Sequence, residues 1–531
     1  MWFDRFAGPR VRRAAAFALA TLLAACGRPG APATAPRPVA GAPEPPPVAH
    51  EFRAAWVATV NNIDWPSKPG LSTAQQQAEL RAILDRAASL HLNAIILQVR
   101  PAADALYSSP YEPWSEYLTG QMGRAPSPYY DPLAFAVAEA HERGLELHAW
   151  FNPYRARQTG AKGPASATHV SVAHPEIVRA YAGYRWMDPG EADTRARSLR
   201  VITDVVRRYD VDGVHIDDYF YPYPEDGRDG RPVPFPDSAS YARYADAGGT
   251  LARDDWRRAN VDAFVHAMYD SVHAAKPWVK VGVSPFGIFR PKEPANACCF
   301  DAYAKLYADS RRWWREGWAD YFTPQLYWKV SAAHQSYPEL LAWWAGENRR
   351  GRHLWPGNYL SRVGTRPNDW RVAEVDSQIA LTRAQPGAGG NVWFSMQTFM
   401  RDVAGVADSL RLGPYAEPAL VPPSPWLPGR APEAPTVAVV RGARPRVTLE
   451  PAAGDESPWL WVVQLREGAR WDTVVLPGSA REYVPLRRAY AGGDAAGPDE
   501  VRAFGVDRTG REGPAARAGL VAHVAAGAGG R

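Results

Sequence analysis

Residues 211–222 read Val211-Asp212-Gly213-Val214-His215-Ile216-Asp217-Asp218-Tyr219-Phe220-Tyr221-Pro222. The first half is a short apolar stretch typical of a buried strand, and the second half is a loop with two adjacent acids and three aromatic rings. Adjacent carboxylates can hold different pKa values, which general acid–base chemistry requires. The alternative is an acid pair that only solvates a loop or caps a helix. The aromatic neighbours favour a functional site over this alternative.

On both sides of this run, short apolar strands alternate with helical stretches, the pattern of a parallel sheet built from βα units. Strands are expected at residues 53–60, 94–99, 146–151, 213–217, 280–284, 321–327, 353–356 and 391–396. Eight such units between residues 51 and 413 predict a (β/α)8 TIM barrel, a fold of the α/β class. The alternative is an open doubly wound sheet, which more often has a glycine-rich phosphate loop after its first strand. Here the first strand runs instead into Asn61-Asn62-Ile63-Asp64-Trp65-Pro66.

A change of composition separates the barrel from a second domain. Residues 414–435 are rich in proline and are interpreted as a linker. Short strands separated by Gly and Pro turns over residues 436–522 predict a small all-β sandwich. Its ending, Ala503-Phe504-Gly505-Val506-Asp507-Arg508-Thr509-Gly510, resembles the last strand and turn of fibronectin type III modules. We expect residues 523–531 to be a disordered tail, and the barrel to fold without the sandwich.

The N-terminus has the pattern of a bacterial lipoprotein signal. Residues 1–26 contain four arginines, then an apolar run too short for a membrane span of about 20 residues. The run ends in Leu23-Ala24-Ala25-Cys26-Gly27, which resembles a lipobox with Cys26 as the lipidated residue. An ordinary cleaved signal peptide is the alternative. Residues 27–50, rich in Pro and Ala, are expected to tether the folded domains to the lipid. Gly27 in place of Asp favours the outer membrane, with the protein facing the periplasm.

Several classes of function are disfavoured. The net charge of +5 comes from scattered arginines without a dense basic patch, so no nucleic-acid partner is expected. His148 and His215 lack a third ligand at catalytic-zinc spacing, and we expect neither metal nor cofactor. Ser284 is not in a G-x-S-x-G turn, which disfavours a serine hydrolase. Cys298 and Cys299 are adjacent and are expected to stay unbridged, because vicinal disulfides are strained.

In a barrel of this kind the active site lies at the C-terminal ends of the strands. The residues there are mostly amides, carboxylates and aromatics, which suit a carbohydrate because sugars present hydroxyls to polar groups and C–H faces to rings. We take Asp217 and Asp218 as the catalytic candidates. The candidates for substrate binding are Asp64, Trp65, Gln98, Arg100, Asp104, Trp150, Asn152, His215, Tyr219, Gln325, Tyr327, Trp328 and Gln397.

Five stretches together resemble one known family. They are residues 53–66, 97–105, 148–154, 213–222 and 324–328, in this order along the chain. They are similar to the glycosyl-hydrolase-like family 10 lipoproteins over roughly residues 51–412. The resemblance implies a (β/α)8 barrel and a glycosidase of the cell envelope that hydrolyses O-glycosyl bonds. Family members include an enzyme that acts on peptidoglycan glycan strands stripped of their peptides, so a peptidoglycan substrate is expected.

The roles of the carboxylates stay open at this level. Strand alternation places His215, Asp217 and Tyr219 on one face, so Asp217 is expected in the cleft and Asp218 at its rim. The second carboxyl group of a glycosidase pair is then Asp218, Asp104 or Asp64, or the acetamide of the substrate replaces it. Tyr219 stands where a chitinase-type motif has its acidic Glu, and the seventh strand ends without a carboxylate. A carbohydrate-binding lipoprotein with a degenerate barrel is therefore the alternative function.

Overall fold

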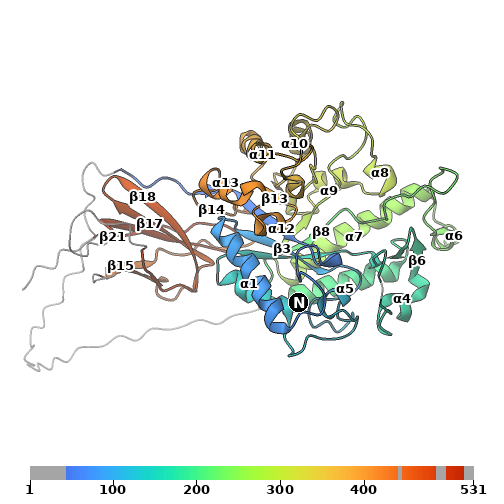
Figure 1. Ribbon diagram of the computed structural model, residues 1–531, viewed down its shortest axis with the longest axis horizontal. Coiled ribbons are helices and arrows are strands. Elements are labelled where there is room, and N and C mark those ends of the chain that lie inside the picture. The colour runs from blue at the N-terminus through green and yellow to red at the C-terminus, as the bar shows by residue number, and fades with distance from the viewer. Residues whose placement is uncertain (1–42, 162, 441–444, 486–497, 520–531) are drawn as a thin grey trace, which may run out of the picture.

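The computed structural model describes residues 43–161, 163–440, 445–485 and 498–519. The predicted signal peptide with Cys26, the tether up to residue 42 and the tail over 523–531 lie outside these residues. The larger body is a barrel of parallel strands surrounded by helices, and a smaller β-sandwich lies beside it (Figure 1). The barrel strands are β2 (Phe52–Val57), β3 (Ala94–Arg100), β4 (Glu146–Phe151), β8 (Gly213–Ile216), β9 (Lys280–Val283), β10 (Tyr321–Phe322), β11 (His353–Leu354), β12 (Gly357–Asn358) and β13 (Gly390–Trp393).

The sheet closes on itself. Its strand order is β11-β10-β9-β8-β4-β3-β2-β13-β12, with every neighbour parallel. The two outer strands, β11 and β12, are halves of one strand interrupted by Trp355 and Pro356. The two ends of the order therefore meet, and the strands form the eight-membered TIM-barrel-like ring that the sequence predicts.

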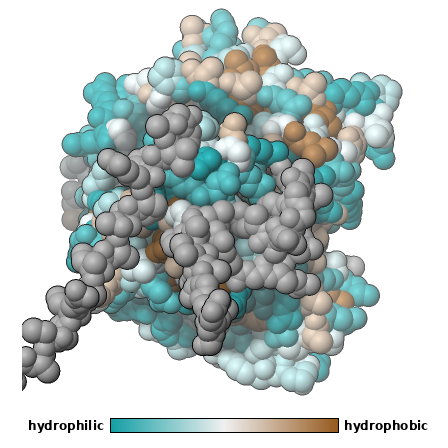
Figure 2. Space-filling model, turned by 90° about the vertical axis from the view of Figure 1, so that its left-hand side faces the viewer, coloured by the Kyte–Doolittle hydropathy of each residue, from teal (hydrophilic) through white to brown (hydrophobic). Residues whose placement is uncertain are grey.

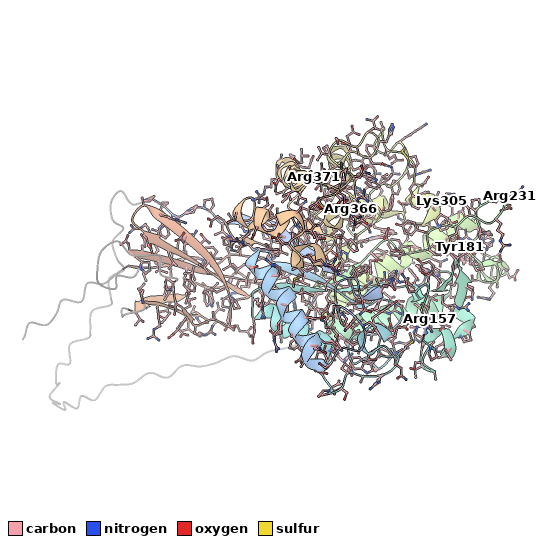
Figure 3. The ribbon with its side chains drawn as sticks, viewed as in Figure 1. Arg157, Tyr181, Arg231, Lys305, Arg366 and Arg371 are labelled. Carbon is pink, nitrogen blue, oxygen red and sulfur yellow. A yellow bond between two sulfur atoms is a disulfide. The ribbon has the colours of Figure 1, made fainter. Side chains whose placement is uncertain are left out.

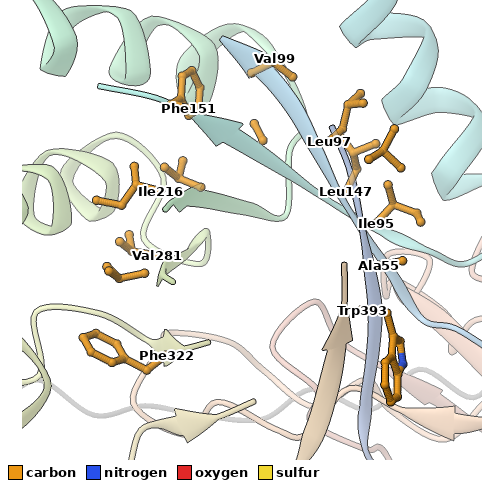
Figure 4. Close-up of a cluster of buried hydrophobic side chains, with 14 of the residues drawn as sticks. Ala55, Ile95, Leu97, Val99, Leu147, Phe151, Ile216, Val281, Phe322 and Trp393 are labelled. Carbon is orange, nitrogen blue, oxygen red and sulfur yellow. The ribbon is translucent and has the colours of Figure 1, made fainter. Parts of the chain in front are cut away.

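The strands are buried on both faces, as in other parallel sheets covered by helices. All seven residues of β3 are buried, and alternate side chains belong to different clusters. Ile95, Leu97 and Val99 pack outward under the helices, whereas Ala94 and Ile96 belong to the barrel interior. Figure 4 shows the outward-facing set on successive strands. The interior also holds large aromatic side chains, so the barrel is a packed core.

Helices follow each strand position of the barrel. The larger ones are α1 (Thr73–Ser89), α3 (Pro132–His141), α5 (Ala192–Arg208), α6 (Ser238–Asp246), α7 (Arg253–Ala275), α10 (Tyr337–Gly346) and α11 (Val372–Ala384). The shorter ones are α2 (Glu116–Thr119), α4 (Val170–Ala173), α8 (Ala302–Lys305), α9 (Ser310–Glu316), α12 (Met396–Met400) and α13 (Val406–Leu412). Helix α1 begins at a capping box, in which Ser72 and Gln75 each accept a backbone N–H of the other.

The loops at the C-terminal ends of β4 and β8 are enlarged. The first contains a small antiparallel sheet of β5 (Arg155–Arg157), β7 (Tyr184–Met187) and β6 (Val178–Tyr181). Figure 3 places Arg157 and Tyr181 of this sheet, and Arg231 of the loop after β8, toward the end of the molecule away from the sandwich. These loops are on the side of the barrel where active sites form.

The C-terminal domain is a sandwich of two antiparallel sheets. One has the order β15 (Thr436–Val440), β16 (Arg446–Glu450), β19 (Glu482–Tyr483). The other has the order β18 (Arg470–Pro477), β17 (Leu460–Glu467), β20 (Glu500–Val506), β21 (Ala516–Gly519). Side chains from both sheets share one core, with Val447 and Leu449 packed against Trp461 and Val463. The likeness to fibronectin type III modules stays a prediction.

The sandwich packs against the N-terminal ends of the barrel strands. Arg508 pairs with Asp210 and with Asp212, where its Nη1 lies 3.3 Å from the Asp212 carboxylate just before β8. The Lys280 ammonium, at the start of β9, donates to the Arg508 carbonyl at 3.4 Å. The ring of Trp459 lies edge-on to His141 at 4.7 Å between centroids. The sandwich therefore lies at the end of the barrel opposite the expected active site.

The predicted linker over residues 414–435 is packed along this interface. Its strand β14 (Ala419–Leu420) pairs in parallel with β1 (Ala49–His50). The Trp426 indole donates to Asp320 at 2.8 Å, and Ser424 Oγ lies 2.9 Å from His353 Nε2. A barrel cut before residue 414 loses these contacts and exposes buried polar groups. We therefore expect such a barrel to be less stable than the full chain.

The residues before the barrel also lie on the sandwich. The carbonyls of Pro43 and Pro46 accept hydrogen bonds from Trp471 and Gln464 of the sandwich, each at 2.8 Å. Viewed from this end, the described surface is mostly hydrophilic, with hydrophobic residues in small groups (Figure 2). None of the helices in the described ranges has the length and apolar character needed to cross a membrane.

One prediction is wrong: Cys298 and Cys299 form a disulfide, with their Cα atoms 3.7 Å apart. Cys299 has a φ of +86°, a left-handed conformation that an extended chain lacks. The prediction rested on the strain of the small ring that a disulfide between neighbouring cysteines closes.

Candidate active site

A cavity of about 320 Å³ opens at the C-terminal ends of the barrel strands. Its volume is near the lower end of the range typical of ligand sites, about 300–1,000 Å³. Several predicted site residues line it together: Gln98, Trp150, Asp217, Asp218, Tyr219, Gln325 and Tyr327. The structure thus brings both catalytic candidates and five substrate-binding candidates to one cavity.

Asp217 and Asp218 both face this cavity, and only 6% and 3% of their surfaces are exposed. The prediction that Asp218 lies at the rim is wrong. Strand β8 ends at Ile216, so strict alternation of faces stops before the acid pair. The backbone N–H of Tyr219 turns back to the Asp217 carboxylate at 3.4 Å, which lets both side chains enter the cavity.

Different partners hold the two carboxylates. The Asn152 amide donates to both oxygens of Asp217, at 2.7 and 2.8 Å. The Tyr223 hydroxyl donates to Asp218, and the Gln325 side chain also hydrogen-bonds to it. Burial, and then the negative charge of Asp218, raises the pKa of Asp217 to about 7. Burial also raises the pKa of Asp218, while its bonds to Tyr223 and Gln325 oppose this.

A second layer of hydrogen bonds fixes Asn152. Its side-chain oxygen accepts from Gln98 Nε2 and from Arg155 Nη2, each at 2.6 Å. Gln98 is held in turn by the backbone N–H groups of Thr59 and Val60, which donate to its oxygen at 3.0 and 2.9 Å. Because the Asn152 oxygen is occupied by donors, its NH₂ group is directed at Asp217. Gln98 and Asn152 therefore orient the catalytic candidate.

His215 lies beneath the cavity and does not line it. The Trp56 indole donates to His215 Nε2 at 3.1 Å, so the ring proton is on Nδ1, which lies 3.0 Å from the Tyr321 hydroxyl. The Tyr321 hydroxyl then donates to His148 Nδ1 at 2.8 Å. Burial lowers the pKa of His215 well below its ordinary value, so the imidazole is neutral.

This chain of hydrogen bonds continues to the opposite end of the barrel. His148 Nε2 lies 2.9 Å from the Glu146 carboxylate, which accepts from the Lys280 ammonium at 2.7 Å. Glycines make room for the rings: a Cβ at Gly213 would lie 2.5 Å from the His148 ring, and one at Gly282 would lie 1.9 Å from the Tyr321 ring. The predicted substrate contact of His215 is replaced by a role in supporting Trp56, which does line the cavity.

Three further candidates, Asp64, Trp65 and Gln397, lie outside the cavity, in the segments that follow the first and last strands of the barrel. The Asp64 carboxylate accepts from the backbone N–H of Ala58 and Gln397, each at 2.8 Å. Gln397 Nε2 donates to the Ile63 carbonyl at 2.9 Å. Trp65 is fully buried in the hydrophobic core. These residues join the loops after β2 and β13, and they do not line the cavity.

Arg100, Asp104 and Trp328 also lie outside the cavity. Arg100 forms a buried bidentate pair with Glu112 at 2.7 and 2.6 Å. Asp104 is fully buried and accepts the Ala102 N–H at 2.9 Å. The ring of Trp328 packs edge-on against Phe286, which is itself outside the cavity lining. Asp64 and Asp104 are therefore not placed as partners of Asp217 across a bound sugar.

Sequence reasoning missed several residues of the cavity, namely Trp56, Arg155, Gln158, Tyr223 and Phe394. Trp56 lies within a strand, and only the alternation of β2 shows that it faces the barrel interior. Arg155 follows the 148–154 motif directly, and its guanidinium lies 4.9 Å from the centre of the Tyr219 ring. Tyr223 was detectable as the aromatic residue that follows Pro222.

The arrangement suits acid–base chemistry on a sugar. Two adjacent carboxylates in a buried site cannot both ionise without mutual repulsion, so the pair retains a proton near neutral pH. Within the described part of the chain, they are the only carboxylates that line the cavity. Nor do the described residues contain a cluster of three or more potential metal ligands.

Comparisons with known proteins agree with this chemistry. A family model described as Glycosyl hydrolase-like 10 matches residues 51–369. Glycosyl hydrolase YngK of Bacillus subtilis (strain 168) is 41% identical over 400 residues, which cover 73% of this chain and 77% of that protein. Glycosyl hydrolase DigH of Escherichia coli (strain K12) is 34% identical over 418 residues, covering 72% of this chain and 92% of that protein.

Among solved structures, the chain is similar to the PgaB (BpsB) glycoside hydrolase domain from Bordetella bronchiseptica. The TM-score is 0.46 at 12% identity, over 68% of this chain and 98% of that one. The family model covers more than half of the chain, and the two relatives extend the match to nearly three quarters of it. The chain therefore belongs to the glycosyl hydrolase-like 10 family and is a glycoside hydrolase.

Proposed function

We propose that this glycosidase cleaves the glycan strands of peptidoglycan at the cell envelope. The observation that carries the proposal is the Asp217–Asp218 pair, the carboxylates of a cavity that is also lined by seven aromatic residues. The rings of Tyr219, Tyr327 and Phe394 offer apolar faces to the C–H faces of a sugar. The resemblance to family members that act on peptide-free strands supports peptidoglycan as the polymer.

The placement of the pair favours an N-acetyl sugar as substrate. Glycosidases that supply both groups usually hold them on opposite sides of the glycosidic bond, about 5–9.5 Å apart. Here both carboxylates follow the same strand, and neither Asp64 nor Asp104 lies across the cavity from them. Adjacent acids suit the route in which the 2-acetamido group of the substrate is the nucleophile.

In this route one member of the pair protonates the leaving glycosidic oxygen while the acetamide oxygen attacks the anomeric carbon. The other member, ionised, accepts the acetamide N–H and stabilises the positive charge of the oxazolinium intermediate. Water then attacks the anomeric carbon and returns its proton to the acid, which restores the pair. Both sugars of a peptidoglycan strand carry 2-acetamido groups, so the route fits the proposed polymer.

The substrate is tested by digestion of two glycan samples with the purified protein: peptidoglycan strands freed of peptides and strands that keep them. We expect oligosaccharides with intact N-acetyl groups from the peptide-free strands, identified by mass spectrometry. Digestion of a β-glucan with no release from either peptidoglycan sample would contradict the proposal.

We also propose that the protein is anchored in the outer membrane through Cys26, facing the periplasm. The described part of the predicted tether, residues 43–50, lies along the sandwich, which packs at the end of the barrel opposite the cavity. An anchor at this end leaves the cavity facing away from the membrane. Replacing Cys26 with alanine should release the protein from the membrane fraction or leave an uncleaved precursor, and a wild-type protein that is already unlipidated and outside the membrane fraction would rule out this anchor.

A further inference from the structure

The cavity contains two deeply buried polar atoms that the protein leaves without partners. Trp150 is 6% exposed and Ser284 is 1% exposed, and both line the cavity. Within the described chain, neither Trp150 Nε1 nor Ser284 Oγ has a hydrogen-bond partner. An unpaired buried donor costs roughly 1–3 kcal/mol, so such atoms are usually satisfied by a ligand or by water.

The two residues flank Asp217 in the barrel. Trp150 is on β4, directly beside His215 of β8 in the strand register. Ser284 follows β9, and its backbone N–H donates to the Ile216 carbonyl at 2.8 Å. Because β4, β8 and β9 are consecutive strands of the barrel, Trp150 and Ser284 are on opposite sides of the acid pair. A sugar bound at Asp217 therefore lies within reach of both strands.

We propose that Trp150 Nε1 and Ser284 Oγ are hydrogen-bonding positions for the sugar at the catalytic centre, and that Trp150 recognises its 2-acetamido group. An indole N–H is a donor only, whereas an ionised carboxylate is an acceptor only. An amide needs one of each, so the acid pair takes the acetamide N–H and Trp150 donates to its carbonyl oxygen. The Ser284 hydroxyl can donate and accept, which matches a sugar hydroxyl.

This inference rests on the proposed function and specifies what its site recognises. It makes the cavity selective for 2-acetamido sugars over sugars with a 2-hydroxyl group. A site whose buried donor stays unpaired with the wrong substrate discriminates strongly against that substrate.

The test compares Trp150→Phe and Ser284→Ala with the wild type on two 4-nitrophenyl β-glycosides, those of chitobiose and cellobiose. These substrates differ in having an acetamide or a hydroxyl at C2. We expect Trp150→Phe to lower kcat/KM on the chitobioside by about 10-fold and to change it little on the cellobioside. Ser284→Ala should lower both by about 10-fold.

Matched controls exist in the same chain. Trp355 Nε1 and Ser310 Oγ are also buried and unpartnered, but neither residue lines the cavity. Trp355→Phe and Ser310→Ala should therefore leave kcat/KM within about twofold of the wild type. Titration of the same proteins with chitotetraose by calorimetry adds a readout that is independent of turnover, with about 10-fold weaker binding expected for Trp150→Phe.

The outcomes separate this inference from the proposed function. If both cavity variants match their controls in rate and affinity, the inference is overturned while the glycosidase assignment stands. If the wild type prefers the cellobioside, the proposed N-acetyl substrate fails, and so does the acetamide contact of Trp150. A wild type that neither cleaves the chitobioside nor binds chitotetraose contradicts both.

Discussion

Asp217→Asn and Asp218→Asn should each lower kcat/KM on peptide-free glycan strands by about 10²–10⁴-fold, the usual contribution of general acid–base catalysis. An asparagine keeps the size of the side chain but can neither give up a proton nor carry the negative charge. Both carboxylates line the cavity, are almost fully buried and have raised pKa values, as a proton donor near neutral pH requires. Initial rates measured by reducing-end release provide the comparison.

The two variants can be told apart with an activated leaving group. A 2,4-dinitrophenyl glycoside departs without protonation, so the variant that lacks the general acid should recover most of its rate on this substrate. The variant that lacks the carboxylate beside the acetamide should stay slow, because this carboxylate assists the attack of the acetamide and not the departure of the leaving group. Asp104→Asn is the matched control: this buried carboxyl also has a raised pKa, about 6, but lies outside the cavity. If either variant of the pair retains full activity, that residue has no catalytic role.

The Asp217→Asn variant should lose activity without losing thermal stability. Burial raises the pKa of Asp217 from 3.8 to about 7, so between these values the folded state binds more protons than the unfolded state. The free energy of unfolding therefore falls as the pH rises through this window, and the loss persists above it. The Asp217→Asn substitution removes this loss, and the new amide oxygen can still accept the hydrogen bond from Asn152. At pH 8 this variant should therefore melt no earlier than the wild type in circular dichroism.

Removal of the sandwich is expected to destabilise the barrel, by an amount that depends on where the chain is cut. A chain ending after residue 435 keeps the Ser424 and Trp426 contacts and loses the apolar cover of the sandwich, including Leu460 and Phe504 on Leu420. A chain ending after residue 413 also leaves the buried Asp320 carboxylate without its indole donor. A buried polar group without its partner costs about 1–3 kcal/mol.

We therefore expect both truncated chains to melt earlier than the full chain, the shorter one by about 1–4 °C more than the longer one. The cavity lies at the other end of the barrel, so the longer truncated chain should keep its rate on a short aryl glycoside at low temperature. Both expectations are checked on the same samples, by thermal melts and by the rate on the aryl glycoside. Melting temperatures equal to that of the full chain would mean that the interface contributes nothing to the barrel.

The barrel could be predicted because its strands are short apolar runs that end in polar and aromatic residues. The run over 211–222 alone placed two acids after a buried strand, and the structure puts both in the cavity. The alternation rule failed at Asp218 because the strand ends before it, and strand ends are not fixed by the pattern of apolar residues.

Other features depend on contacts between distant parts of the chain. Asp64 resembles a catalytic acid in sequence, yet it accepts backbone N–H groups from residues 58 and 397, which only the closure of the barrel brings together. Trp56 and His215 are 159 positions apart, and their hydrogen bond follows from both side chains facing the barrel interior. The docking of the sandwich likewise depends on Arg508 reaching Asp210 and Asp212, which no local pattern shows.

The most direct test of acetamide-assisted catalysis is a series of aryl glycosides whose 2-acetamido group carries zero, one, two or three fluorine atoms. Fluorine draws electron density from the carbonyl oxygen and weakens it as a nucleophile, with little change in the size of the sugar. If the acetamide attacks the anomeric carbon beside Asp217 and Asp218, kcat/KM falls steeply with each added fluorine. A rate that is insensitive to fluorination would contradict the mechanism and would require a protein nucleophile instead.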